Sequence, residues 1–269
     1  MANVAESDYL LDTLSLWDSC VFAFSPYKRL SKNFSGNLVN IRRGSDDATK
    51  AFGYDSNGDI DTSAIESWLA GADGFVVSVA NQANESYPIY QDDTTKQPKI
   101  ATSGTVLTEG ILFDGSVTAL IIDDYAALRM TEPPISIYGT YKRESSHVGF
   151  VFCRNNVGSD DAQYSILNDG TKVSAWWDGN ERLIADNQES NNDLIVWNSI
   201  LADGLKMNTN GNESSGLFNT TLTDVANTSI GARRNPTSFS TVFDGAGKTI
   251  LVFNADVYSS YADLVAGNI

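Results

Sequence analysis

The chain has 269 residues, 42% of them hydrophobic and 10% aromatic, which is enough to fill the core of one large β domain or two ordinary domains. Acidic residues outnumber basic residues 34 to 18, giving a net charge of -16. This excess argues against a nucleic-acid partner, because affinity for phosphate backbones depends on clustered Lys and Arg. Cys20 and Cys153 lie far apart without a metal-binding motif, so we expect two buried free thiols and predict no metal and no cofactor.

The start of the chain, MANVAESDYL, carries acids where a signal peptide needs basic residues. No stretch approaches the roughly 18 apolar residues of a membrane span. We therefore expect a chain made in the cytoplasm, with no signal peptide and no membrane insertion.

Two ordered segments are predicted near the amino terminus. Apolar residues over Leu10–Phe24 begin near helical spacing and end near alternation, which predicts a short helix running into a strand. A strand is predicted over Asn37–Arg43, with Arg42 and Arg43 on opposite faces. We interpret these arginines, with the aspartates that follow at 46 and 47, as an ion-pair network that secures the segment to the rest of the fold. A subunit interface is the alternative.

The stretch Asp55–Asp61 carries alternating oxygen side chains, as calcium loops do, but Gly58 stands fourth where an EF-hand needs glycine sixth. A hairpin-like or helix-entry turn is the favoured interpretation, with a bound cation as the alternative. A helix follows, with Ser63 and Glu66 at capping-box spacing and the face of Trp68 turned inward.

The remaining chain is predicted to be mostly β. Residues 83–103 are polar and predict a long surface connection. From residue 105, short apolar runs separated by polar turns indicate an antiparallel sandwich or jelly roll, ending in a short helix over 256–264. The runs are 105–113, 119–122, 135–141, 147–153, 163–168, 172–177, 193–200, 205–208, 228–231 and 248–253.

The carboxyl-terminal half resembles a concanavalin A-like, laminin G-type jelly roll. The order of its strand and turn motifs across residues 105–269 carries this resemblance. The motifs are Ile111–Gly115, Ala119–Ile122, Ile135–Tyr138, Leu205–Asn208, Asn210–Glu213, Ser229–Ala232, Phe243–Gly245 and Ile250–Asn254. The resemblance implies a mostly β chain with a jelly-roll sandwich over 105–269 and an amino-terminal strand and helix unit over 1–104 packed on it.

The opening stretch resembles a segment found in arabinofuranosidase B-like enzymes and in phage tail and virion proteins. The matching pieces are Leu10–Asp12, Ala23–Ser25 with Arg29–Leu30, Phe34–Gly36, Val39–Arg43 with Ser45–Asp46, Asp61–Ala64 and Gly71–Phe75. The match ends at Val79–Glu85, where only Gln82 remains of a Tyr-Asp-Gln-Ser-Gly run typical of the family. No catalytic carboxylate can be transferred from the family to this chain.

The best candidate binding site is the stretch Ala175–Arg182. Adjacent strand residues face opposite ways, so its two tryptophans cannot both lie in the core. An exposed indole beside amide and carboxylate groups is typical of a sugar-binding face. The alternative is that both rings are buried, one in the core and one under a loop or a subunit. The candidate residues are Trp176, Trp177, Asp178, Asn180, Glu181 and Arg182.

These observations favour a non-enzymatic virion protein, tail- or capsid-associated, that displays a lectin-like sandwich for host glycan contact or for assembly. Its expected partners are other virion proteins, further copies of the chain as a homo-oligomer and a host-surface glycan. An arabinofuranosidase-like glycoside hydrolase is the first alternative, and a purely structural decoration protein is the second.

Overall fold

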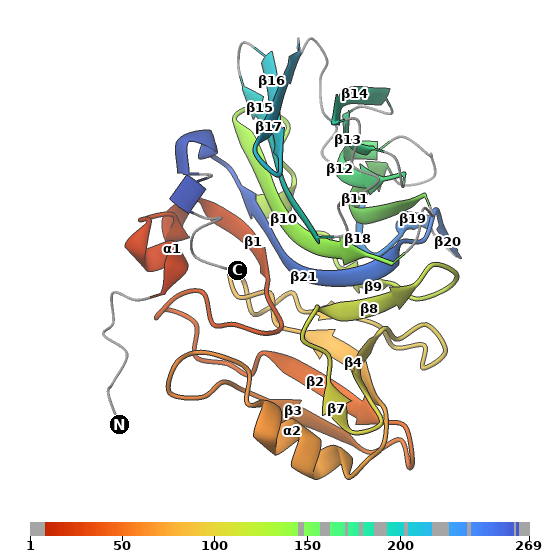
Figure 1. Cartoon of the computed structure of the whole chain (residues 1–269). Helices are drawn as coiled ribbons and strands as arrows, with labels where there is room; N and C mark the ends of the chain where they lie inside the picture. The colour runs from red at the N-terminus through yellow and green to blue at the C-terminus, as the bar shows by residue number, and fades with distance from the viewer. Residues whose placement is uncertain are drawn as a thin grey trace.

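The computed structural model describes residues 9–144, 148–156, 162–169, 172–177, 180–185, 193–201, 204–216, 226–235, 238–260 and 262–263. Within these ranges the chain folds into a large antiparallel β-sandwich of jelly-roll type with a few short helices (Figure 1). This confirms the predicted mostly β class.

The element bounds are as follows. The helical elements are α1 (Leu10–Thr13), η1 (Trp17–Ser19), α2 (Thr62–Leu69), η2 (Ala126–Leu128) and η3 (Tyr258–Ser260). The strands of the first half are β1 (Cys20–Phe24), β2 (Val39–Arg43), β3 (Thr49–Phe52), β4 (Gly74–Val79), β5 (Ile89–Tyr90), β6 (Lys99–Thr102), β7 (Thr105–Val106), β8 (Ile111–Asp114) and β9 (Leu120–Ile122). Those of the second half are β10 (Ile135–Arg143), β11 (Gly149–Asn156), β12 (Ala162–Asn168), β13 (Val173–Trp177), β14 (Asn180–Ala185), β15 (Asp193–Leu201), β16 (Gly204–Thr209), β17 (Asn212–Gly216), β18 (Ala226–Ile230), β19 (Arg233–Asn235), β20 (Ser238–Ser240) and β21 (Asp244–Phe253).

The strands form two layers. In the first, pairing runs β17-β16-β15-β10-β21, and the far edge of β21 pairs with β8 near its start and with β1 near its end. In the second, pairing runs β14-β13-β12-β11-β18-β9-β5-β4-β2-β3. Strand β6 pairs with both β4 and β8 and so joins the layers. Apolar side chains of both layers, such as Ile137 and Phe152, are fully buried in one shared core.

The predicted helix-to-strand transition over Leu10–Phe24 is confirmed by α1, η1 and β1. Strand β1 pairs antiparallel with the last strand, from Cys20 opposite Phe253 to Phe24 opposite Ile250. The chain therefore closes its sheet with its first and last strands, which lie side by side in Figure 1.

A buried glutamine fixes the segment that follows β1. The side-chain nitrogen of Gln82 donates to the carbonyl oxygens of Ser25 at 3.1 Å and Lys28 at 2.8 Å. Its side-chain oxygen accepts the backbone N–H of Leu30 at 2.9 Å. Gln82, the residue retained from the family pattern, thus satisfies three backbone groups of a segment without regular structure.

The preceding amide fixes β1 itself. The side-chain oxygen of Asn81 accepts the backbone N–H of Ala23 at 3.0 Å, and its nitrogen donates to the Tyr125 hydroxyl at 2.9 Å. The same hydroxyl donates to the carbonyl oxygen of Val21 at 2.5 Å. Because these groups are all buried, each hydrogen bond replaces contacts with water that the fold has removed.

Helix α2 forms where it was predicted, with a different cap. Asp61 is the N-cap, and its carboxylate accepts the backbone N–H of Ala64 at 3.0 Å, whereas Ser63 lies inside the helix. The Glu66 carboxylate does not close a capping box but accepts the backbone N–H of Val106 at 3.1 Å. Glu66 therefore binds a distant backbone group in place of the predicted capping-box contact at the start of its own helix.

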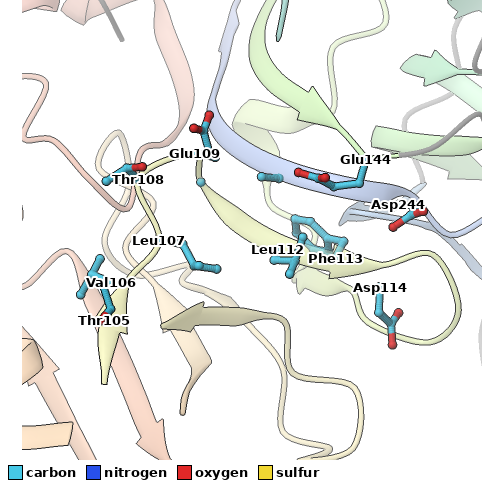
Figure 2. Close-up of a pocket in the computed structure, with 12 residues that line it drawn as sticks. Thr105, Val106, Leu107, Thr108, Glu109, Leu112, Phe113, Asp114, Glu144 and Asp244 are labelled. Carbon is cyan, nitrogen blue, oxygen red and sulfur yellow. The ribbon is translucent and has the colours of Figure 1, made fainter. Parts of the chain in front are cut away.

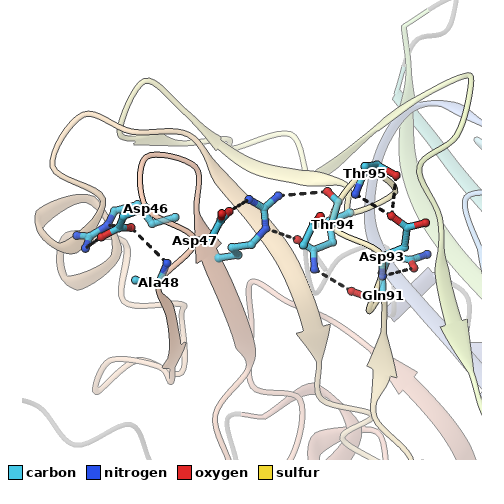
Figure 3. A network of polar contacts seen from close by, with 10 residues as sticks. Asp46, Asp47, Ala48, Gln91, Asp93, Thr94 and Thr95 are labelled. Atoms are coloured by element: carbon cyan, nitrogen blue, oxygen red, sulfur yellow. Dashed lines mark hydrogen bonds and ion pairs between the residues drawn. The ribbon is translucent and has the colours of Figure 1, made fainter.

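The predicted ion-pair network of the double arginine is confirmed (Figure 3). Arg42 pairs with Asp47 at 2.6 Å and Arg43 with Asp46 at 2.7 Å. Arg42 also donates to the Gln97 side chain at 2.7 Å. The network extends across the second layer through amide groups, because Gln97 donates to the carbonyl oxygen of Gln91 and the Gln91 side chain donates to that of Ala119.

The prediction of a surface connection over residues 83–103 is wrong. This stretch contains β5 and β6, and Ile89 is fully buried in the shared core. The ring of Tyr87 stacks on that of Tyr125 with centroids 4.6 Å apart. Its strands are only two and four residues long and are separated by polar turns, so the composition of the stretch resembles that of a loop.

Each of the ten apolar runs predicted from residue 105 onward contains a strand. Strands β14, β17, β19 and β20 were not predicted. In β17, for example, no apolar side chain marks a buried face. The predicted tail helix is represented by η3, and residues 264–269 lie outside the described ranges. The division at residue 104 stays a prediction.

Replacing Gln82 with alanine should lower the free energy of unfolding by about 2–4 kcal/mol, because three backbone groups lose their partner inside the protein. Urea unfolding followed by tryptophan fluorescence measures this change. Asn212→Ala, which removes an exposed amide on β17, is the control and should cost less than about 0.5 kcal/mol. Equal losses in the two variants would contradict the role given to Gln82.

Candidate functional site

A pocket of about 590 Å³ opens beside the start of β21. Apolar side chains from β7 and β8 and the segment between them, including Val106, Leu107 and Leu112, form part of its lining (Figure 2). Four carboxylates also line it: Glu109, Asp114, Glu144 and Asp244. A concave apolar site with a few converging polar groups is the usual form of a small-molecule site.

The strand register brings these acids together from distant parts of the sequence. Asp114 at the end of β8 lies opposite Asp244 at the start of β21. Glu144 follows β10 directly, and its backbone N–H donates to the carbonyl oxygen of Asp244 at 3.2 Å. Glycine is required between the strands, because a Cβ atom on Gly245, at φ 155°, would collide with the carbonyl oxygen of Lys142.

Asp114 has a structural task. Its carboxylate accepts the backbone N–H groups of Ser116, Val117 and Thr118, each at 3.0 Å, and the Thr118 hydroxyl at 2.9 Å. Partial desolvation acts to raise the pKa of Asp114, but these hydrogen bonds together hold the pKa below its ordinary value. Figure 2 shows the carboxyl group directed away from the other three acids. Asp114 is therefore an anion that shapes the turn.

The other three carboxylates differ in their pairing. Glu109 forms an ion pair with Lys142 at 3.6 Å. Within the described residues, neither Glu144 nor Asp244 is paired with a cation, and Asp244 is half-buried. Glycoside hydrolysis uses two carboxyl groups, and these two differ in exposure, because Asp244 is half-buried and Glu144 is exposed.

The predicted sugar-binding stretch forms the hairpin of β13 and β14. Trp176 lies opposite Glu181 and Trp177 opposite Asn180. Trp176 is half-buried, its ring centroid lies 6.3 Å from that of Phe150, and its ring nitrogen donates to the Ser174 hydroxyl at 3.1 Å. Asp178 and the side chains of Trp177, Asn180, Glu181 and Arg182 lie outside what the structure describes. Of this stretch, the structure therefore places the Trp176 ring in a small apolar cluster.

The sequence interpretation missed a buried arginine on the neighbouring strands. Arg154, only 1% exposed, forms an ion pair with Asp124 at 2.9 Å and donates to the Thr228 hydroxyl at 3.1 Å. Register places Arg154 beside Tyr164, and Tyr164 opposite Trp177. One row across this layer thus carries the buried Arg154 on β11, Tyr164 on β12 and the predicted aromatic position Trp177 on β13. A charged residue in the apolar strand Gly149–Asn156 was the available signal.

Other candidate chemistry is not supported by the described residues. Both cysteines are buried free thiols, as predicted, and burial raises the pKa of Cys20 to about 12, so it stays protonated at neutral pH. The Asp55 carboxylate caps a tight turn by accepting the backbone N–H groups of Asn57 and Asp59. No cluster of three or more potential metal ligands occurs among the described residues.

The fold is similar to that of solved arabinofuranosidases. A GH54 α-L-arabinofuranosidase carrying a Glu-to-Gln substitution and soaked with 4-nitrophenyl α-L-arabinofuranoside matches with a TM-score of 0.70 and 16% identity, over 93% of this chain and 63% of that chain. A GH54 enzyme soaked with a cyclic sulfate inhibitor gives a TM-score of 0.68 with the same identity and coverage. An arabinofuranosidase complexed with arabinofuranosyl-α-1,2-xylobiose gives 0.69 at 14% identity, over 96% of this chain and 64% of that chain.

This chain therefore spans slightly less than two thirds of the length of these enzymes, and the similarity establishes the fold. No protein-family model and no curated protein sequence matches it. The prediction of a non-enzymatic protein is contradicted by these arabinofuranosidases, which share its fold over 93% and 96% of its length. Among the described residues, no helix has the length and apolar character needed to cross a bilayer.

Sequence reasoning also missed the pocket acids. Glu109 lies inside the predicted run 105–113, and Glu144 and Asp244 lie a few residues outside the runs 135–141 and 248–253. Nothing in the sequence shows that β8, β10 and β21 are neighbours. A carboxylate at a strand end is usually a solvated turn residue. Only the register of the strands distinguishes these three acids from the other 31 of the chain's 34 acidic residues.

Asp114 should contribute stability that depends on pH. Because its pKa is lower in the folded state, the stabilisation is present above the unfolded pKa of about 3.9 and is lost as pH falls through the folded pKa. Asp114→Asn should therefore lower the melting temperature at neutral pH and make little difference in strong acid. Asp18→Asn, at an exposed position, is the control. A difference that stayed constant with pH would contradict the role of the charge.

Proposed function

We propose that the chain is a glycoside hydrolase that removes arabinofuranosyl groups from a larger carbohydrate. The observation that carries this proposal is the shared fold over 93% of the chain, with a TM-score of 0.70 to an enzyme soaked with an aryl arabinofuranoside. The matched part of those enzymes is 63% of their length, so the activity of the whole enzyme is here a proposal for this chain.

In this proposal the reacting groups are carboxylates of the pocket beside β21. Glu144 and Asp244 are the best candidates, because Asp114 is committed to its turn and Glu109 is paired with Lys142. Glycoside hydrolysis needs one carboxyl group to protonate the leaving oxygen and one carboxylate to attack the sugar or to activate water. Asp244 is half-buried and lies beside the apolar lining, whereas Glu144 is exposed.

The stretch Trp176–Arg182 remains a proposed sugar contact. Its support is the register that puts Trp177 next to Tyr164, with the buried Arg154 one strand further on. The virion role and its partner proteins draw no support from the similar structures. A homo-oligomer and a host glycan partner stay predictions.

The proposal is tested by incubating the protein with 4-nitrophenyl α-L-arabinofuranoside and following release of nitrophenol. We expect turnover, and we expect Asp244→Asn and Glu144→Gln each to lower kcat by roughly 10²–10⁴-fold, as the loss of an acid or base group does. Trp177→Ala should instead raise KM, since a stacked ring contributes to binding.

Glu213→Gln, which changes an exposed acid on β17, is the matched control and should keep full activity. All variants need the same far-ultraviolet circular dichroism as the parent. Absence of turnover on arabinofuranosides by the parent protein would refute the proposed activity. Turnover that survives both pocket substitutions would refute the assignment of the pocket as the reacting site.

A further inference from the structure

A second pocket, of about 190 Å³, lies between β2, β3 and β4 and the turn that leads into β5. It shares no lining residue with the carboxylate pocket beside β21. Its polar and apolar lining side chains come from five short segments of the amino-terminal part of the chain. The residues on which the argument depends are Asn37, Asn40, Ala51, Ser78, Glu85 and Pro88.

Strand register explains why polar side chains gather here. Asn40 on β2 lies opposite Ser78 on β4 and opposite Ala51 on β3. Its neighbours Val39 and Ile41 are buried in the core, so Asn40 belongs to the face that is turned away from the core. Asn40 and Ser78 therefore form a cross-strand polar pair on an outer surface of the sandwich.

The hydrogen-bonding capacity of this pair is unused inside the protein. Within the described part of the chain, the side chains of Asn37, Asn40, Ser78 and Glu85 form no hydrogen bond or ion pair. The same sheet face carries Arg42, which is fully engaged with three partners. Unlike Arg42, these side chains leave amide, hydroxyl and carboxylate groups free to form hydrogen bonds with a ligand in the pocket.

The position of the acid depends on a glycine. A Cβ atom on Gly36 would collide with Oε2 of Glu85, so the carboxylate lies directly against the backbone at that residue. Any side chain larger than hydrogen at position 36 would displace it. The same Cβ atom would lie 3.2 and 3.3 Å from two ring carbons of the buried Phe34, so glycine here makes room for a core ring as well as for the exposed acid.

We infer that this pocket binds one neutral sugar ring. Its volume lies below the usual range of roughly 300–1,000 Å³ for drug-sized ligands, which suits a single ring. Pro88 and Ala51 offer apolar surface to the C–H groups of the ring, while the amides, the hydroxyl and the carboxylate bind its hydroxyl groups. The Glu85 charge repels uronic acids and other anionic sugars. The inference goes beyond the proposed hydrolysis, because this site needs no reaction.

The test uses ¹⁵N-labelled full-length protein carrying Asp244→Asn, so that binding is observed without dependence on the carboxylate pocket. Titration with L-arabinose, D-xylose or D-galactose should shift the side-chain amide signals of Asn37 and Asn40 for at least one sugar. D-Glucuronate should not shift them. Asn40→Ala combined with Ser78→Ala should weaken that binding by at least roughly 10-fold, the loss expected for two hydrogen bonds. Asn212→Ala, at an exposed edge, should leave it unchanged.

Gly36→Ala is the second variant and keeps the test decisive if the double variant folds poorly. It leaves Asn37, Asn40 and Ser78 unchanged but displaces the Glu85 carboxylate, and it should weaken sugar binding by at least threefold while the spectrum stays dispersed. Equal shifts with neutral sugars and glucuronate would overturn the inference, as would the absence of shifts at Asn37 and Asn40 with all neutral sugars. Activity on arabinofuranosides in the presence or absence of this binding reports on the proposed function separately.

Discussion

The structure depends on two adjacent buried amides, Asn81 and Gln82. Asn81 fixes β1 and Gln82 fixes the irregular segment after it, so both are bound to the second layer. Strand β1 in turn pairs with β21, the strand that β10 and β8 also flank. Buried amides are costly when unpaired and specific when satisfied, which makes this pair a precise determinant of where the amino-terminal segment lies. The carboxylate pocket lies at the start of β21, whereas β1 pairs with the end of that strand. The positions of both therefore depend on β21.

Much of the fold could be predicted from the sequence, since apolar spacing marks strands and helices wherever one face is buried. Helix α2 and ten β runs were predicted on that basis. The failures have physical causes. The polar strand β17 has no buried face, β5 and β6 are too short to show a period, and Glu66 bonds Val106 across the fold in preference to its own helix end. Sequence periodicity and capping patterns predict contacts between residues that are close in sequence, whereas these residues make contacts with residues that are distant in sequence.

The candidate sites show the same limit. The ion pairs of Arg42 and Arg43 were predictable because their partners lie within a few residues. Glu144 and Asp244 were not, because only strand pairing brings them together. The tryptophan pair drew attention by its chemistry, and one of its rings proves to lie against Phe150 in a small cluster. The similarity to arabinofuranosidases corrected the non-enzymatic interpretation. That interpretation had rested on the resemblance to virion proteins, the loss of the family motif after Val79, the lack of a signal-peptide pattern and the excess of acidic residues.

The pairing of β1 with β21 has a consequence for biosynthesis. A ribosome delivers Cys20–Phe24 long before Asp244–Phe253, so β1 has no partner strand until β21 has been synthesised. Contacts between such distant positions close a long loop and tend to slow folding. Until then the apolar residues of β1 remain available to chaperones or to other nascent chains. Production at reduced temperature, with slow elongation and chaperone support, is the regime that this topology favours.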